Sequence, residues 1–294
     1  MDTKLTGKTR IESDLIGARE IPAEALYGVQ TLRGIENFSI SKFRLSEYPL
    51  FIKGLAITKM AAAMANFELG LLTVEQKDAI IAACGEILDG KHHDQFPVDM
   101  IQGGAGTTTN MNANEVIANR ALELMGHERG EYQYCSPNDH VNCSQSTNDA
   151  YPTAIHIGMY FKHLQLLPHL EELIASFRKK GEEFSQIIKM GRTQLEDAVP
   201  MTLGQTFNGF ASILQDEIAH LNEAAADFLV VNMGATAIGT GICAEPGYAE
   251  KCIAALREIT GWDIRLSSDL VGATSDTSCL VGYASAMKRV CVKM

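Results

Sequence analysis

Two long stretches of apolar residues at helical spacing limit the folds that this chain can adopt. Leu, Ile and Phe recur three or four positions apart over 153–190, and again over 203–232. About 30 residues at 1.5 Å each make roughly 45 Å of helix, and an apolar stripe of that length needs partner helices along all of it. Pro168 lies in the first stretch and predicts a kink or a break into two helices. The pattern predicts a mainly α fold with a helix bundle shared between subunits.

Shorter helical patterns account for most of the remaining chain after residue 48. They run over 49–69, from a capping box at Thr73 to Gly90, over 111–125, and from 276 to Met294. The first 45 residues predict irregular structure with a small strand pair. The last helix has no Gly, Asn or Pro terminator, which favours a chain cut within a longer helix.

Composition and charge exclude several classes of function. The net charge of −11, without any cluster of Lys and Arg, argues against a nucleic-acid partner. The charged N-terminus lacks the apolar region of a signal peptide, and no uninterrupted apolar run approaches membrane-spanning length, so no membrane partner is expected. The seven cysteines are scattered without CxxC spacing and indicate reduced thiols in a cytoplasmic protein.

Two segments without acidic or basic side chains, apart from one histidine, carry the clearest functional signal. They span Met100–Asn114 and His140–Asn148, are rich in Gly, hydroxyls and amides, and each leads into a helical pattern. Neutral donors at a helix N-terminus, together with the helix dipole, can hold a small carboxylate. Helix capping by the same Thr and Ser side chains is the alternative, and spacing alone favours it.

Five segments in order resemble the aspartase/class II fumarase superfamily, and within it the aspartase branch. They are IESDLIGAREIPAEALYGVQTLRGIENF (11–38), GAGTTTNMNANEVIANRALELMG (104–126), GEYQYCSPNDHVNCSQSTNDAYPT (130–153), KMGRTQLEDAVPMTLGQ (189–205) and GATAIGTG (234–241). The resemblance implies a mainly α fold whose small mixed N-terminal lyase domain is 1–148. It makes 149–294 an incomplete central helix-bundle domain, and it implies a homotetramer with active sites shared between subunits.

The resemblance also implies a small dicarboxylate substrate, L-aspartate, from which an ammonia-lyase eliminates ammonia to give fumarate. The positions around one carboxylate and the amino group are matched by Thr107, Ser146, Thr147 and Asn148, and those toward the α-carboxylate by Thr193 and Gln194. Loss of the C3 proton makes a carbanion next to a carboxylate, which takes up the additional negative charge and becomes an aci-carboxylate. Fixed neutral donors around that carboxylate would stabilise the charge. Gln194 cannot titrate and therefore cannot be the base.

One superfamily signature has no counterpart in the sequence. It is a Gly-Ser-Ser-x-Met-Pro-x-Lys-x-Asn loop that carries the serine base and the α-carboxylate ligands. The chain is therefore expected to be the N-terminal three-fifths of such a lyase, to contain no catalytic base of its own, and to be inactive alone. No metal site and no organic cofactor are expected, although activation by a divalent cation, as in some relatives, stays open.

Two other functions remain as alternatives. A class II fumarase would use the same chemistry with water as the leaving group, but Gln194 and Ser136 stand where fumarases carry His. A non-catalytic structural fragment would keep the bundle without chemistry.

Several further residues invite functional interpretations that are less favoured. His140 follows Asp139, yet a structural histidine bonded to backbone is the better interpretation. The adjacent His92 and His93 point in different directions and indicate a solvated turn rather than a metal site. The glycines of 234–241 predict a tight connection after the long helix, a candidate lining of the site, and not a nucleotide loop.

Overall fold

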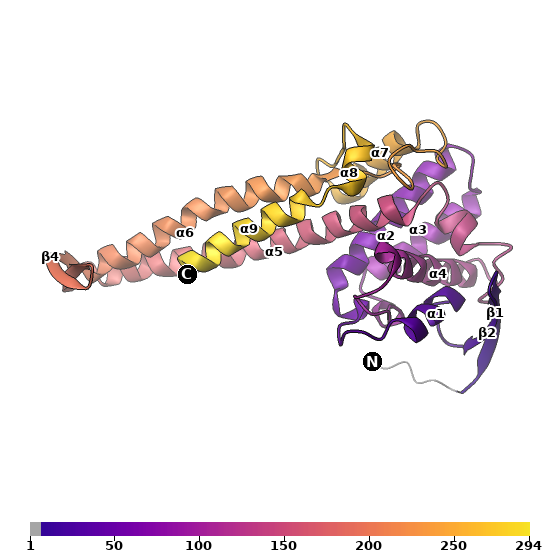
Figure 1. The fold of residues 1–294 in the computed structure, drawn as a ribbon, viewed down its shortest axis with the longest axis horizontal. Helices are drawn as coiled ribbons and strands as arrows, with labels where there is room; N and C mark the ends of the chain where they lie inside the picture. The colour runs from indigo at the N-terminus through magenta and orange to yellow at the C-terminus, as the bar shows by residue number, and fades with distance from the viewer. Residues whose placement is uncertain (1–6) are drawn as a thin grey trace. The chain divides into compact units, whose positions relative to one another are not determined.

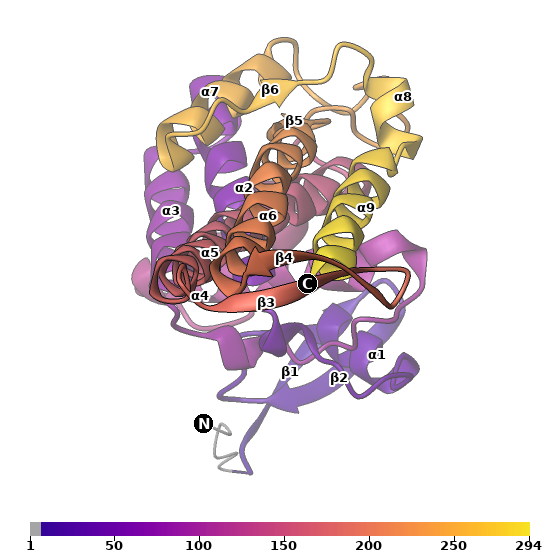
Figure 2. The same ribbon diagram turned by 90° about the vertical axis from the view of Figure 1, so that its left-hand side faces the viewer.

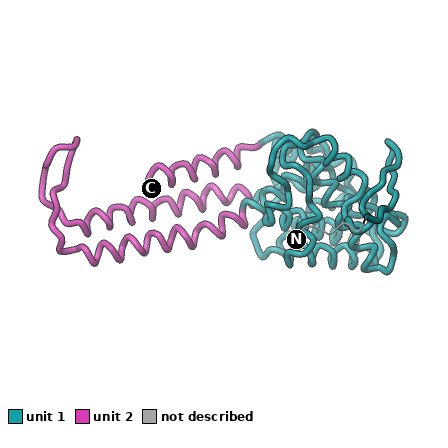
Figure 3. The backbone as a smooth tube through the Cα atoms, turned by 90° about the horizontal axis from the view of Figure 1, so that it is seen from below, with its two compact units in different colours: residues 1–159, 229–276 teal, residues 160–228, 277–294 magenta. Residues whose placement is uncertain are grey.

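The computed structural model is mainly α-helical and describes residues 7–294 (Figure 1). It divides into two compact units, coloured teal and magenta in Figure 3. Unit 1 comprises residues 1–159 and 229–276, and unit 2 comprises residues 160–228 and 277–294. The predicted domain boundary after residue 148 stays a prediction, because these units mark compact packing within one chain.

Four helices build the core of unit 1. Helix α2 (Pro49–Glu68) packs against α3 (Val74–Leu88), α4 (Thr107–Leu124) and α7 (Tyr248–Thr260) (Figure 2). Their buried faces are made mainly of Ala, Ile, Leu and Val, which pack closely because Ala lets helix backbones approach. The predicted helices over 49–69 and 73–90 are confirmed, and α4 begins four residues earlier than predicted.

The start of α3 follows the predicted capping box. Thr73 Oγ1 accepts a hydrogen bond from the Gln76 backbone N–H at 3.2 Å, and Gln76 Oε1 accepts one from the Thr73 N–H at 3.1 Å. Two N–H groups that would otherwise lack partners at the helix start are therefore satisfied by local side chains.

Helix α2 passes a length-and-composition test for a membrane span, with a mean hydropathy of 1.3 over an 18-residue window. The helix is not an uninterrupted apolar run, because Lys53 and Lys59 lie within it. In addition, 67% of that window is buried inside the fold. A core helix of a folded domain passes the same test, and the burial of α2 fits that case.

The first 45 residues contain a hairpin and a helix. Strands β1 (Thr9–Asp14) and β2 (Gly17–Pro22) pair antiparallel, which confirms the predicted strand pair. Helix α1 (Val29–Asn37), which the sequence analysis did not predict, follows them and packs on α4.

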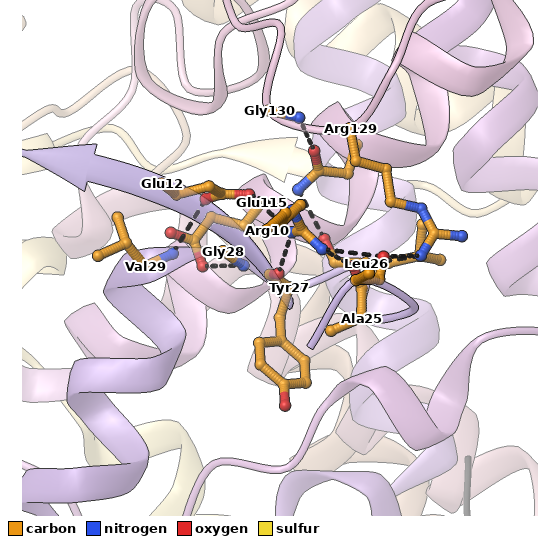
Figure 4. A network of polar contacts seen from close by, with 12 residues as sticks. Arg10, Glu12, Ala25, Leu26, Tyr27, Gly28, Val29, Glu115, Arg129 and Gly130 are labelled. Carbon is orange, nitrogen blue, oxygen red and sulfur yellow. Dashed lines mark hydrogen bonds and ion pairs between the residues drawn. The ribbon is translucent and has the colours of Figure 1, made fainter. Parts of the chain in front are cut away.

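A carboxylate from α4 caps α1 from a distant part of the sequence (Figure 4). Glu115 Oε2 accepts hydrogen bonds from the backbone N–H groups of Gly28 at 2.8 Å and Thr31 at 3.0 Å, and Oε1 accepts one from Gln30 at 2.8 Å. Burial raises the pKa of Glu115 to about 7, against the lowering effect of these N–H groups. Helix α1 has no capping side chain of its own, so its start leaves no local pattern to detect.

Arg10 joins the hairpin to the segment that precedes α1 (Figure 4). Its guanidinium donates to the carbonyl oxygens of Pro22 at 3.0 Å, Ala25 at 2.7 Å and Tyr27 at 2.9 Å. It also pairs with the buried Glu12 at 2.6 Å. One side chain thus ties together carbonyl groups from the end of β2 to the start of α1.

Shorter elements complete unit 1. They are the 3-10 helices η1 (Leu45–Glu47), η2 (His93–Gln95) and η3 (Gly104–Gly106), the π-helix η4 (Pro137–Val141), the parallel pair β5 (Val230–Val231) and β6 (Arg265–Leu266), and α8 (Leu270–Ser275).

Unit 2 consists of long helices that lie side by side, with a hairpin at one end (Figure 3). The helices are α5 (Thr147–Glu183, in unit 2 from residue 160), α6 (Leu203–Ala226) and α9 (Ser278–Lys293). Between α5 and α6, β3 (Ile188–Thr193) and β4 (Glu196–Thr202) form an antiparallel hairpin. The 3-10 helix η5 (Asp227–Leu229) follows α6.

Buried charge fixes α9 to α6. Glu217 is fully buried, and its carboxylate pairs with Arg289 at 3.0 Å and with Lys293. The two cations, Lys293 first, hold the pKa of Glu217 below its ordinary value. The helix predicted from residue 276 onward is therefore anchored at its last turns.

Two expectations for the long helices need correction. The break into two helices, one of the two outcomes predicted at Pro168, does not occur: α5 continues through Pro168, although the proline gives the Leu164 carbonyl no N–H donor. The helical patterns also end earlier than predicted, α5 at Glu183 and α6 at Ala226, because the residues that follow enter β3 and η5.

The Arg10 contacts predict that two arginine substitutions differ in their effect on the free energy of unfolding. We expect Arg10→Ala to lower the free energy of unfolding by about 2–4 kcal/mol, because it removes the cation paired with the buried Glu12 and a donor to the Ala25 and Tyr27 carbonyls. Arg19→Ala removes only an exposed ion pair with Glu36 at 3.8 Å, and we expect a change within about 0.5 kcal/mol. Denaturant unfolding measures both, and equal losses would contradict the anchoring role of Arg10.

Candidate active site

The starts of α4 and α5 meet within unit 1. Asn110, in the first turn of α4, donates through Nδ2 to Thr147 Oγ1 at 3.2 Å. A Cβ atom placed on Gly106, just before α4, would lie 2.6 Å from the ring of Tyr151 in the first turn of α5. The two uncharged segments singled out by sequence therefore converge on one place.

The hydroxyl groups at these helix starts are already held by local bonds. Thr107, the first residue of α4, is exposed and donates through Oγ1 to the Gly104 carbonyl at 2.6 Å. Ser146 Oγ accepts from the Asn148 N–H at 3.3 Å, as a capping side chain does. Capping uses only an oxygen lone pair of Ser146, so its hydroxyl hydrogen stays available to a ligand.

Asn148 is exposed and is tied to the segment 232–237. Its side-chain Nδ2 donates to the Ala237 carbonyl at 2.6 Å, and its own carbonyl accepts from Asn232 Nδ2 at 3.0 Å. The predicted tight connection at 234–241 therefore packs against the start of α5. This contact agrees with the interpretation of the connection as a candidate lining of the site.

Thr193 and Gln194 lie in unit 2, at the tip of the β3–β4 hairpin, where both are exposed. Gln194 and Leu195 form the turn with positive φ angles of 51° and 71°. Neither of these two predicted residues takes part in the hydrogen bonds of Thr147 and Asn148 in unit 1.

Backbone strain gathers at the candidate site. Three residues other than glycine adopt positive φ next to it: Ala105 at 49°, Ser144 at 59° and Thr236 at 58°. Each lies within two residues of a segment that carries, or bonds to, a predicted site residue. Strained backbone of this kind persists where the surroundings hold it, and it is common at functional sites.

A buried lysine lies beneath the second uncharged segment. Lys59 of α2 is fully buried and donates to Asn142 Oδ1 at 3.0 Å and Gln145 Oε1 at 2.8 Å. Asn142 Oδ1 also accepts from Asn110 at 3.1 Å and from Asn114 at 3.2 Å. Burial lowers the pKa of Lys59 to about 7, although the charge of Asp149 opposes this shift. In the sequence, this buried hydrogen-bond network is marked only by a lysine within an apolar helix.

A buried aspartate lies in the first turn of α5. Asp149 Oδ1 accepts from the Ser146 N–H at 2.9 Å, and Oδ2 accepts from the N–H groups of Gly234 at 3.1 Å and Thr236 at 3.0 Å. Burial raises the pKa of Asp149 to about 6, against the lowering effects of its backbone donors and Lys59. The sequence analysis did not single out either Asp149 or Lys59.

The histidines singled out from sequence have structural partners. His140 Nδ1 accepts from the Ser136 N–H at 2.7 Å, as expected for a structural histidine, and burial lowers its pKa. His92 bonds to Glu86 at 2.8 Å, and His93 donates from Nε2 to the Ile87 carbonyl at 2.9 Å. Within residues 7–294, no group of three or more His, Cys, Asp or Glu side chains could hold a metal ion.

A cavity of about 540 Å³ lies elsewhere in unit 1, between the β1–β2 turn and α4. Ile16, Met111, Glu115 and Tyr132 are among its lining residues, and none of the predicted site residues lines it. The candidate site is therefore an open polar surface at two helix starts and not this cavity.

Comparison with known proteins places the chain in a family. A lyase family pattern matches residues 17–294. The chain belongs to this lyase family.

The relatives with curated names include aspartate ammonia-lyases. The chain is 54% identical over 286 residues to the one from Pseudomonas canavaninivorans, covering 97% of this chain and 60% of that protein. It is 52% identical over 291 residues to the one from Escherichia coli strain K12, covering 99% of this chain and 61% of that protein. The chain thus spans about 60% of the length of the curated relatives that it matches.

Solved structures agree with this assignment. The fumarate lyase:delta crystallin from Brucella melitensis bound to cobalt has a TM-score of 0.96 and 50% identity, covering 97% of this chain and 62% of that one. A class II fumarase from Schistosoma mansoni has a TM-score of 0.92 and 32% identity, covering 97% and 63%. The comparisons confirm the superfamily and the mainly α fold inferred from sequence.

The contact between α4 and α5 predicts a difference between two glycines. Gly106 and Gly126 both have positive φ, at 94° and 82°, but only Gly106 faces a neighbour within 4 Å, the Tyr151 ring. We expect Gly126→Ala to cost about 1 kcal/mol of stability, and Gly106→Ala to cost about 1–3 kcal/mol more. Denaturant unfolding of both variants measures the difference, and similar losses would contradict the close approach.

The buried lysine predicts a pH dependence. Between its folded pKa of about 7 and its ordinary value of 10.5, Lys59 binds fewer protons in the folded state than in the unfolded state. Its contribution to stability therefore rises with pH, by up to about 1.4 kcal/mol per pH unit. We expect Lys59→Met to remove this rise between pH 7 and 8.5 in denaturant titrations, while titrating groups that do not interact with Lys59 cancel in the comparison.

The matched control is Lys53→Met, which removes a half-buried lysine from the same helix. It should keep the rise with pH. An identical pH slope in the wild-type and Lys59→Met chains would show that Lys59 is not the group responsible.

Proposed function

We propose that this chain supplies the carboxylate-binding part of an ammonia-lyase that converts L-aspartate to fumarate and ammonia. The observation that carries the proposal is the meeting of two uncharged, hydroxyl-rich helix starts, at Thr107 and at Ser146–Asn148. Its support from relatives is 52–54% identity to proteins named aspartate ammonia-lyase. Both starts lie in segments that match the superfamily.

The proposed chemistry is an anti elimination through an aci-carboxylate. Removal of the C3 proton places a second negative charge on the neighbouring carboxylate. The hydroxyls of Thr107, Ser146 and Thr147 would donate to that carboxylate as its charge develops, and the α5 dipole adds to the same field. For Thr107 this requires its hydroxyl hydrogen to leave the Gly104 carbonyl. Asn148 would lie at the amino group.

The remaining roles are assigned to groups outside these 294 residues. The superfamily loop with the serine base and the lysine and asparagine for the α-carboxylate has no counterpart in residues 1–294. We propose that the complete site needs that loop, and that Thr193 and Gln194 join it in an assembly of subunits, as the resemblance implies. The 294-residue chain alone would then show negligible turnover.

Assembly, cofactors and location are further parts of the proposal. Exposed apolar side chains on the helices of unit 2 support association into a homotetramer: Leu164, Phe210, Ile213, Val281 and Val292. No organic cofactor is needed for the proposed elimination. Activation by a divalent cation stays open, and a cytoplasmic location is proposed from the cysteine pattern.

A class II fumarase is the second candidate. The Schistosoma mansoni structure supports it through a shared fold at 32% identity. Gln194 and Ser136 oppose it, because neither offers the imidazole that fumarases carry at those positions. Comparing fumarate release from L-aspartate and from L-malate separates the two reactions.

The direct test combines the chain with the part of the Escherichia coli relative that lies beyond their alignment, either fused or as a separate chain. We expect fumarate release from L-aspartate, followed by ultraviolet absorbance, in the combination and not in the bare chain. In the combination, Thr147→Val should lower kcat about 100-fold, because it removes one donor to the charged carboxylate. Robust activity of the bare chain would refute the division of roles.

Failure of every combination, with correct folding, would favour the third candidate, a structural fragment without chemistry. Release of fumarate from L-malate but not from L-aspartate would replace the ammonia-lyase by a fumarase.

A further inference from the structure

One buried carboxylate joins two segments about 85 positions apart in the chain. Asp149 has no exposed surface. Its Oδ1 accepts from the Ser146 N–H, and its Oδ2 accepts from the N–H groups of Gly234 and Thr236. An aspartate that only capped α5 would need one oxygen, so the second oxygen has a separate use.

This arrangement is costly to build. A carboxylate loses its hydration on burial, and no cation bonds directly to Asp149 among the ion pairs of residues 7–294. Its compensation comes from three backbone N–H groups and from the field of the buried Lys59. An apolar residue would fill the same space without that cost, but it would leave the Gly234 and Thr236 N–H groups without acceptors.

The linked segments hold Asn148 from two sides. Its backbone carbonyl accepts from Asn232, and its side-chain amide meets the Ala237 carbonyl at 2.6 Å. Because that carbonyl can only accept, the NH₂ group of Asn148 must face it, and Oδ1 must point elsewhere. Within the described chain, no residue donates to Asn148 Oδ1, so this oxygen is available to a ligand donor.

We propose that Asp149 is a positioning residue that fixes the orientation of the Asn148 side-chain amide. By locking the 234–237 turn to the start of α5, it keeps the Ala237 carbonyl against Asn148 Nδ2. The Asn148 oxygen then accepts a hydrogen bond from the amino group of the substrate. This inference rests on the proposed function for its substrate, while the link itself is a property of the fold.

The test uses two matched acid-to-amide variants. Asp149→Asn keeps the shape of the side chain. Its amide nitrogen cannot accept a hydrogen bond, so only the neutral amide oxygen remains as an acceptor for the N–H groups of the two segments. Glu115→Gln makes the same change in another buried carboxylate that holds three backbone N–H groups, those of Gly28, Gln30 and Thr31. Hydrogen exchange by mass spectrometry reads the protection of each segment separately.

In Asp149→Asn we expect exchange to accelerate about tenfold or more in 144–150 and 232–240, because charge-assisted bonds are lost. Exchange in α3 should stay unchanged. In Glu115→Gln, hydrogen exchange should accelerate in 26–37 and stay slow in 144–150. Unchanged exchange in both linked segments, or equal acceleration throughout unit 1, would overturn the positioning role.

Activity of the combined enzyme gives a second measurement. Asp149→Asn should lower kcat/KM for L-aspartate about 100-fold, since small displacements of a binding group are expensive, while Glu115→Gln stays close to wild type. Wild-type kcat/KM in Asp149→Asn would overturn the proposal. If the wild-type combination releases no fumarate, the proposed function fails, and the exchange result still decides whether Asp149 links the segments.

Discussion

The surface of the candidate site depends on two charges buried beneath it. Lys59 donates to Asn142 and Gln145 in the segment that leads to α5, and Asp149 receives N–H groups from both sides of Asn148. Each charge loses hydration, and the pKa values of both move toward neutrality as a result. Buried ions contribute little net stability, but they fix geometry that an apolar core would leave adjustable.

The contacts made by these buried charges explain how an acidic chain could bind a dicarboxylate. With a net charge of −11, long-range attraction of an anion is unavailable. Uncharged hydroxyl, amide and backbone donors can act instead, provided that they are held in place before the ligand arrives. The strained backbone at Ala105, Ser144 and Thr236 fits such pre-organisation. The bonds to the buried charges hold the neighbouring segments in place, where the strained φ angles would otherwise relax.

Local patterns predicted part of the fold and of the candidate site. The Thr73 capping box and the uncharged segments each carry their information within a few residues, so the helices after them could be found. Helix α1 could not, because its cap, Glu115, comes from α4. The roles of Lys59 and Asp149 were also hidden, since their partners lie far along the chain. The break that Pro168 predicted does not occur, because the proline removes one hydrogen bond from a helix of 37 residues whose other turns continue.

The central claim is that the starts of α4 and α5 form one binding surface for a dicarboxylate. Titration of the isotopically labelled chain with fumarate, followed by backbone amide resonances, tests it most directly. The account predicts shifts at Thr107 and at Ser146–Asn148 together, with one common affinity, and none at the Glu115-capped start of α1. Shifts at only one of the two helix starts, or at neither, would contradict it.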